Sequence, residues 1–135
     1  PGTVSAKCVS RLAVMIDVSG SIEPELLARF SREVEAIARR TSAACSVYIG
    51  DDRLRAVRHF DSGKLSLRNL QVKGGGGTDF TPLLEAADEY GADIGVFLTD
   101  LDGPANYRPR FPVVWAVADL FAQLRAPFGS MVSVS

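Results

Sequence analysis

Oxygen-bearing side chains follow apolar stretches of this sequence at spacings that suit a metal ion. The stretch VMIDVSGSIE places Asp17, Ser19 and Ser21 at every second position, directly after an apolar run. Thr78 follows a run of glycines, and Asp100 closes the apolar stretch IGVFLTD. Because alternate residues of an extended turn lie on one side, Asp17, Ser19 and Ser21 can converge on one ion.

This donor set favours magnesium or manganese. Both ions prefer about six oxygen ligands in an octahedral shell that water can complete, whereas zinc prefers nitrogen or sulfur. Calcium would favour more carboxylates than Asp17 and Asp100 supply. Since the hydroxyls are neutral, these aspartates do little more than balance the charge of a divalent ion, and the ion stays strongly electrophilic if they bind through water. A glutamate or aspartate of another protein is therefore the natural further ligand.

Strands of a mostly parallel sheet would bring these side chains to one edge. Residues 11–18, 94–100 and 111–118 are apolar runs typical of strands buried on both faces. Residues 45–52 and 54–60 are shorter candidates. Asp51 and Asp52 can form the turn between them, which predicts a hairpin and an antiparallel edge strand. In such sheets ligands gather at the carboxyl ends of the strands, where the strand order reverses.

Two helices are predicted between these strands. The first begins at Pro24 and ends near Arg40, because apolar residues recur every three or four positions, with acids at its start and arginines at its end. The second covers residues 81–91, with Thr81 as the cap and Gly91 as the terminator. Together with the strands, they predict an α/β, Rossmann-like, mostly parallel sheet with helices on both faces.

The remaining segments are less regular. Residues 65–72 are irregular or a strand, 120–125 can form a short helix, and 130–135 alternate apolar and polar residues. The 135 residues fit one domain, which we place at 11–135 after a polar segment of residues 1–10.

Composition excludes several partners. Fifteen basic against sixteen acidic residues give no basic field for nucleic acid or for an acidic membrane surface. No apolar stretch approaches the roughly 20 residues of a membrane-spanning helix, and residues 1–11 do not read as a signal peptide. Cys8 and Cys45 lack metal-binding spacing, so buried or incidental thiols are expected. We therefore expect a cytoplasmic location. A start at Pro1 suggests a piece of a longer protein.

The five oxygen donors resemble a known motif. Asp17-Val18-Ser19-Gly20-Ser21 is similar to the DxSxS element of the metal-ion-dependent adhesion site (MIDAS) of von Willebrand factor type A domains. Thr78 in GGTD and Asp100 in LTD match its two later elements. From about Leu12 onward, IDVSGSI, GGGGTDF, LTDLDG, FPVVWAV and APFG resemble the C-terminal von Willebrand A-like domain of bacterial predicted metal-dependent peptidases.

The resemblance implies roles for these residues and for neighbouring proteins. Ser19 and Ser21 would bind the ion directly, Asp17 and Asp100 directly or through water, and Thr78 according to conformational state. In relatives a separate N-terminal region carries the presumed zinc motif of the peptidase, and a MoxR-type AAA+ ATPase is a common neighbour. This chain has one histidine, His59, and no HExxH. It also has little sequence after Ala118 for the usual final helices.

Three functions stay open at this point. The favoured one is a non-enzymatic, metal-dependent module that binds a carboxylate of a protein partner. The alternative is a metal-assisted hydrolase or phosphoryl-transfer enzyme with Asp17 as nucleophile or base; no histidine, lysine or cysteine stands beside the motif to assist it. The third is a structural domain in which Asp17, Ser19 and Ser21 only cap the following helix.

Other polar and aromatic residues have simpler interpretations. Asp79 is expected to cap the second helix and Trp115 to lie in the core. His59 is expected to be structural or exposed, and the glycines before Thr78 to let the backbone approach the ion. The arginines of the edge strand are expected to form a solvated face that blocks strand pairing, with an acid-binding patch as the alternative. These arginines are Arg53, Arg55 and Arg58.

Overall fold

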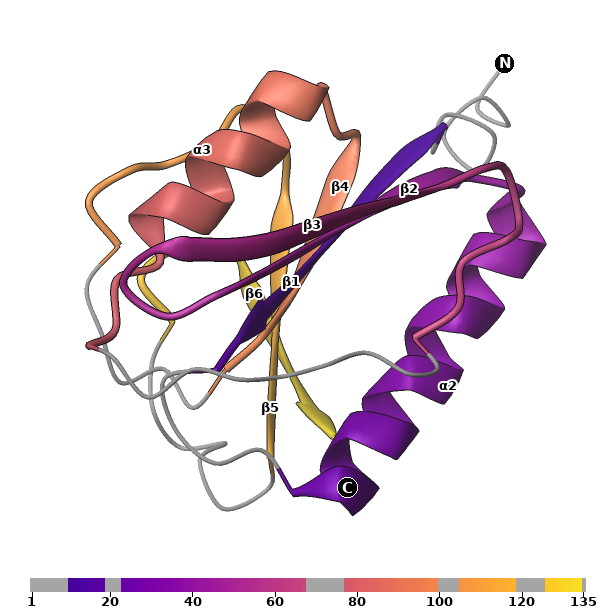
Figure 1. Cartoon of the computed structure of the whole chain (residues 1–135), viewed down its shortest axis with the longest axis horizontal. Helices are drawn as coiled ribbons and strands as arrows, with labels where there is room; N and C mark the ends of the chain where they lie inside the picture. The colour runs from indigo at the N-terminus through magenta and orange to yellow at the C-terminus, as the bar shows by residue number, and fades with distance from the viewer. Residues whose placement is uncertain (1–9, 19–22, 68–76, 100–104, 119–125, 135) are drawn as a thin grey trace.

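The computed structural model describes residues 10–18, 23–67, 77–99, 105–118 and 126–134, which form a six-stranded sheet between helices (Figure 1). The strands are β1 (Arg11–Asp17), β2 (Ala44–Gly50), β3 (Leu54–Phe60), β4 (Ile94–Leu98), β5 (Val113–Ala118) and β6 (Ser130–Val134). The helices are α2 (Pro24–Thr41) and α3 (Thr81–Tyr90). Within the described residues no helix is long and apolar enough to cross a membrane.

The strand order is β3-β2-β1-β4-β5-β6. Strand β1 pairs in parallel with β2 and β4, and β5 pairs in parallel with β4 and β6. Strand β3 pairs antiparallel with β2 and lies at the edge of the sheet. The predicted α/β fold with one antiparallel edge strand is confirmed. The strand order reverses beside β1, which places the carboxyl end of β1 where such sheets bind ligands.

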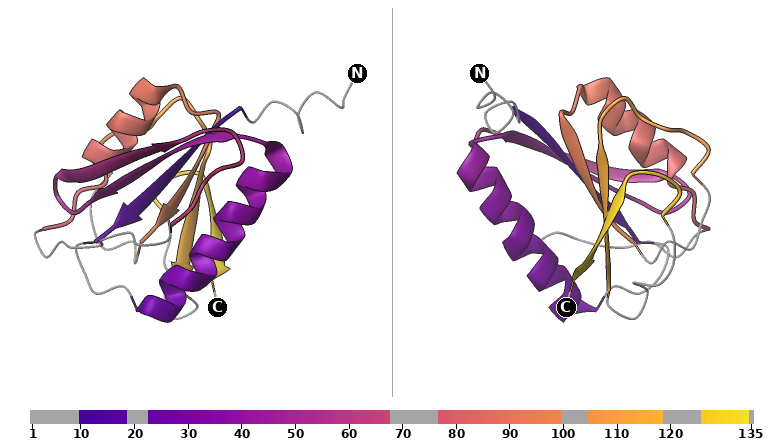
Figure 2. Two further views of the ribbon diagram at one scale, coloured as in Figure 1. Left: turned by 45° about the vertical axis from the view of Figure 1, so that its right-hand side comes forward. Right: turned by 180° about the vertical axis from the view of Figure 1, so that it is seen from behind.

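The two helices cover opposite faces of the sheet (Figure 2). Alternate residues of β1 explain this arrangement, because side chains of a strand point to opposite faces in turn. Leu12 and Val14 pack in one apolar cluster with Phe30 of α2, whereas Met15 packs in the other with Leu84 of α3. The continuous apolar run of β1 is therefore needed to fill both layers.

Helix α2 begins and ends where the sequence predicts. Pro24 stands in its first turn, where the missing N–H of proline removes no helical hydrogen bond. Glu25 lies in the first turn and Arg39 and Arg40 in the last, so the charges complement the helix dipole. The last helical residue is Thr41, and Ser42 is the C-cap, with a left-handed conformation at φ of 55°.

Helix α3 has a different cap from the predicted one. Thr81 is its first residue, not its cap, and the Thr81 hydroxyl accepts a hydrogen bond of 3.0 Å from the Asn106 N–H. The N-cap position is held by Phe80, without a side-chain cap hydrogen bond, so the prediction that Asp79 caps the helix is not confirmed. The Asp79 carboxylate, one residue before the cap, accepts a hydrogen bond of 2.9 Å from the Thr81 N–H in the first turn. Gly91 ends the helix with φ of 80°, as predicted.

Several predicted boundaries change. Strand β4 ends at Leu98 instead of residue 100, and β5 begins at Val113 instead of residue 111. The alternating C-terminal segment forms β6, and residues 65–67 have no regular structure. The predicted short helix at 120–125 and residues 68–72 lie outside the described residues.

Candidate metal centre at the carboxyl edge of the sheet

Asp17 is the last residue of β1 and is buried, with a relative exposure of 6%. The apolar residues before Asp17 are buried, so β1 runs through the core. Asp17, as the last residue of β1, therefore lies at the carboxyl edge of the sheet. Val18 continues the pairing, because its N–H donates a hydrogen bond of 2.8 Å to the carbonyl of Gly50. The end of β1 is thus held against the end of β2.

Thr99 is a hydrogen-bond partner of this carboxylate. Its hydroxyl donates a hydrogen bond of 2.7 Å to Oδ2 of Asp17, and its backbone N–H donates to the carbonyl of Ala116 on β5 at 3.2 Å. Thr99 follows β4 and is the sequence neighbour of Asp100. The ends of β1 and β4 are therefore joined directly at this edge through Asp17 and Thr99.

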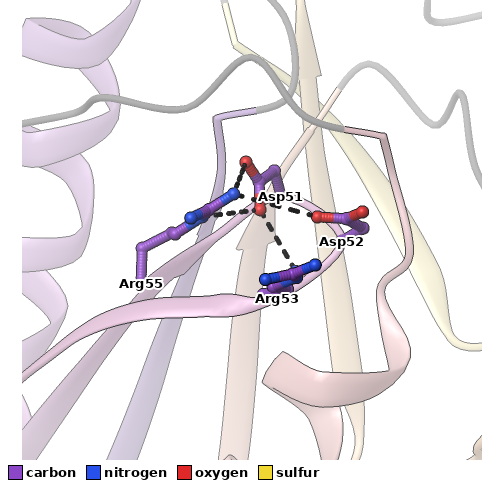
Figure 3. A network of polar contacts seen from close by, with 4 residues as sticks. All are labelled: Asp51, Asp52, Arg53 and Arg55. Atoms are coloured by element: carbon purple, nitrogen blue, oxygen red, sulfur yellow. Dashed lines mark hydrogen bonds and ion pairs between the residues drawn. The ribbon is translucent and has the colours of Figure 1, made fainter.

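The turn between β2 and β3 adds a second buried carboxylate (Figure 3). Asp51 is only 1% exposed, and both of its oxygens accept hydrogen bonds from the guanidinium of Arg55, at 2.9 and 3.0 Å. The Arg53 N–H also donates to Asp51 Oδ1 at 3.1 Å. This bidentate ion pair offsets the desolvation cost of burying the Asp51 carboxylate and makes the turn rigid.

Thr78 lies at the same edge, because the residue after it is hydrogen-bonded to this turn. The backbone N–H of the next residue, Asp79, donates a hydrogen bond of 3.3 Å to the carbonyl of Asp51. On the other side of Thr78, a Cβ built on Gly77 would lie 3.6 Å from Oδ2 of Asp52. Thr78 itself is half-buried. Since Asp51 directly follows Gly50, the partner of Asp17 in the sheet register, Thr78 and Asp17 flank the same strand end.

The structure thus brings two of the five predicted ligands to one edge, Asp17 and Thr78. Ser19, Ser21 and Asp100 lie outside the described residues. Within the described part of the chain, no three His, Cys, Asp or Glu side chains gather as a metal-binding group. The predicted ligand set contains only two carboxylates and is otherwise made of hydroxyls.

Reasoning from the sequence alone missed Thr99 and the Asp51–Arg55 pair. The sequence shows Thr99 as a polar residue at the end of an apolar strand, but it does not indicate that the Thr99 hydroxyl bonds to Asp17. Arg55 lies on the exposed face of β3, as expected, and its guanidinium also pairs with the buried Asp51, a contact that the sequence does not indicate. The approach of the glycine backbone to an ion stays a prediction. At Gly77 neither φ nor the space around an added Cβ by itself requires glycine, and residues 74–76 lie outside the described residues.

A separate polar cluster fixes the segment that leads into β5. Asp88 of α3 accepts hydrogen bonds from the Tyr107 hydroxyl and from Arg110 Nε, the latter at 3.1 Å. Burial acts to raise the pKa of the Asp88 carboxyl, but these hydrogen bonds outweigh it and hold that pKa below its ordinary value. The cluster therefore favours the ionised carboxylate and ties residues 105–110 to α3.

The remaining predictions about single residues are consistent with burial. Cys45 is buried, and burial raises the pKa of its thiol to about 11, which keeps it protonated; Cys8 lies outside the described residues. His59 is exposed and its Nδ1 contacts the hydroxyl of Ser46, a structural role. Trp115 is fully buried in the core, as predicted.

Comparison with known families supports the fold and goes no further. The family model described as a VWA-like domain (DUF2201) matches residues 12–135. Searches of curated proteins and of solved structures give no significant match. The match begins one residue into β1 and includes the segments that contribute Asp17, Thr78 and Thr99 to the carboxyl edge. The chain therefore belongs to the family of VWA-like domains (DUF2201).

Proposed function

We propose that this domain is a metal-dependent protein-binding module. Mg²⁺ or Mn²⁺ would be held by Asp17, Ser19, Ser21, Thr78 and Asp100, and would take a glutamate or aspartate carboxylate of a partner as a further ligand. The ion supplies electrophilic attraction for that carboxylate. The chain supplies the oxygen ligands and a rigid edge that presents them, without a catalytic role of its own.

The observation that carries this proposal is the junction at the end of β1. Asp17 is buried there, hydrogen-bonded to Thr99, with the Thr78 loop fastened to the adjoining strand end. Segments far apart in sequence thus converge where sheets of this type bind ligands. The donors on them are carboxylate and hydroxyl oxygens, which suit magnesium and manganese.

The Thr99 bond gives Asp17 a defined orientation. A hydroxyl that donates to Oδ2 fixes the plane of the carboxylate, as supporting hydrogen bonds do for metal-ligating groups. Thr78 is held near the hairpin turn by the backbone hydrogen bond of its neighbour, in which the Asp79 N–H donates to the Asp51 carbonyl. The Thr78 hydroxyl is not needed for this contact and can serve a ligand. Both features are those of a site prepared before the ion arrives.

The biological setting extends this proposal. Family resemblance favours a cytoplasmic bacterial protein in which this domain follows a metallopeptidase region, with a MoxR-type AAA+ ATPase as the class of partner. In that arrangement the domain would recruit the partner, and any peptide hydrolysis would belong to the preceding region. Nucleic acid and membrane are not expected partners, because the chain is close to neutral with 15 basic and 16 acidic residues.

Metal-induced stabilisation tests the metal site. With a dissociation constant of about 1 mM, about 10 mM Mg²⁺ should stabilise the chain by roughly 1.4 kcal/mol and raise Tm by about 3–6 °C. Asp17→Asn should lose this shift, because the buried carboxylate charge is gone. Thermal unfolding followed by circular dichroism after chelator treatment, with and without Mg²⁺ or Mn²⁺, measures the effect.

Asp61→Asn is the matched control. Asp61 is an exposed acid in the turn after β3, so its variant loses the same charge and should keep the full shift in Tm. Equal shifts in wild type and Asp17→Asn would show that the ion binds elsewhere. No shift in the wild type at this concentration would contradict a site of the stated affinity.

A further inference from the structure

Arg53 is an exposed cation in the hairpin turn that follows Gly50, the register partner of Asp17 at the carboxyl end of β1. It lies in the turn between β2 and β3, and both its backbone N–H and its carbonyl are hydrogen-bonded. The Arg53 N–H donates to Asp51 Oδ1, and the Arg53 carbonyl accepts from the Asp51 N–H, each at 3.1 Å. The backbone of Arg53 is thus fixed beside the candidate metal centre, whereas its side chain faces solvent.

The neighbouring charges are already matched with one another. Arg55 pairs with both oxygens of the buried Asp51 and lies 4.0 Å from Oδ1 of Asp52 (Figure 3). Among the residues that the structure describes, Arg53 forms no ion pair. Arg53 therefore offers the one guanidinium of this turn that is not engaged with an acid.

The separation from the metal centre suits a short acidic segment. In the sheet register, Gly50 lies between Asp17 on one side and Leu54 on the other, so Leu54 is about two strand spacings, roughly 10 Å, from Asp17. Arg53 directly precedes Leu54. In an extended peptide, side chains two residues apart point to the same side and are separated by about 7 Å, a span that the long side chain of Arg53 can meet.

We infer that Arg53 is a specificity-determining residue that binds a second acid of the partner, two residues from the carboxylate held by the ion. This inference rests on the proposed function and adds the partner's chemistry: an extended acidic segment of the type Glu-x-Glu. Guanidinium groups suit carboxylates because their donors match both oxygens. Acid binding was the alternative interpretation for the three edge-strand arginines, and we now assign it to Arg53 alone.

Peptide binding at saturating Mg²⁺ tests this inference. The probes are acetyl-Ala-Glu-Ala-Glu-Ala-amide and the same peptide with Gln in place of either Glu. The wild type should bind the two-acid peptide about fivefold more tightly than either one-acid peptide, near the upper end for an exposed charge pair. In Arg53→Gln this ratio should fall to about two, the statistical factor that remains because either glutamate can bind the ion, with Mg²⁺ affinity unchanged. The preference should also shrink as salt is raised, because exposed charges are screened.

Arg58→Gln is the matched control. Arg58 is an exposed arginine in the middle of β3, opposite Val47, so its variant has the same net charge as Arg53→Gln and should keep the fivefold ratio. Metal binding without a preference for two acids beyond this statistical factor would overturn the role of Arg53 and leave the metal site intact. A ratio retained in Arg53→Gln would also overturn it. Absence of metal binding would remove the proposed function and this inference together.

Discussion

Trp115→Ala is expected to reduce the free energy of unfolding by about 3–5 kcal/mol and to lower Tm by roughly 10–20 °C. Trp115 is fully buried on β5 and lies among aromatic rings of three other segments. Its ring stacks on Phe97 with centroids 4.9 Å apart, and the Phe80 and Phe128 rings lie 5.3 and 5.5 Å away. Truncation removes this packing and leaves a cavity at the centre of one layer.

The indole N–H adds a specific contact. Trp115 Nε1 donates a hydrogen bond of 2.6 Å to the carbonyl of Phe128, just before β6 begins. Trp115→Phe keeps an aromatic ring but not this donor, so it should cost less, about 1–2 kcal/mol. Val132→Ala, at a valine that is 46% exposed, should change stability by less than about 0.5 kcal/mol. Urea unfolding of the three variants measures this order, and a Trp115→Ala cost below that of Trp115→Phe would contradict it.

Gly50→Ala is expected to destabilise the fold by about 2–3 kcal/mol and to weaken metal binding as well. A Cβ at Gly50 would lie 2.3 Å from the carbonyl oxygen of Arg53 and 2.6 Å from Cδ1 of Leu83. The first of these atoms belongs to backbone that cannot simply rotate away. Relief of the clash must displace the turn whose Asp51 carbonyl holds the Thr78 loop through the Asp79 N–H.

Gly63→Ala separates this steric effect from the general cost of replacing glycine. Gly63 has a positive φ of 71°, but nothing lies within 4 Å of its added Cβ. Only left-handed backbone strain of about 1 kcal/mol is therefore expected there, without a change in Mg²⁺ affinity. Urea unfolding and Mg²⁺ titration of both variants measure the contrast. Equal stability costs, or unaltered Mg²⁺ affinity in Gly50→Ala, would contradict the role of the turn in positioning Thr78.

Much of the fold could be predicted because local signals agree with burial. The apolar run before Asp17 fills both layers of the sheet, so its length and composition alone indicate a central parallel strand. The start of α2 at Pro24 and the end of α3 at Gly91 depend on the intrinsic conformations of those residues. Segment 130–134 was harder, because its pairing with β5 depends on residues distant in sequence.

The candidate site could be predicted only as residue types at strand ends. Which partner orients each group depends on register and turn geometry, which sequence spacing does not contain. Arg53, Arg55 and Arg58 look alike in sequence, yet only the bend at Asp51 decides that Arg55 reaches the buried carboxylate. In the same way, Thr99 contacts Asp17, 82 residues away in the chain, because β1 and β4 are adjacent in the sheet.

The most direct measurement of the central proposal is calorimetric titration of Mg²⁺ and Mn²⁺ into the chelator-treated chain, with and without acetate as a carboxylate ligand. The wild type should show saturable binding at a dissociation constant of about 1 mM or below, tightened by acetate. Ser19→Ala/Ser21→Ala should lose it, whereas Ser31→Ala, whose hydroxyl bonds to the Leu27 carbonyl within α2, should keep it. No binding by the wild type at millimolar metal, or equal binding by Ser19→Ala/Ser21→Ala, would contradict a metal-dependent binding module.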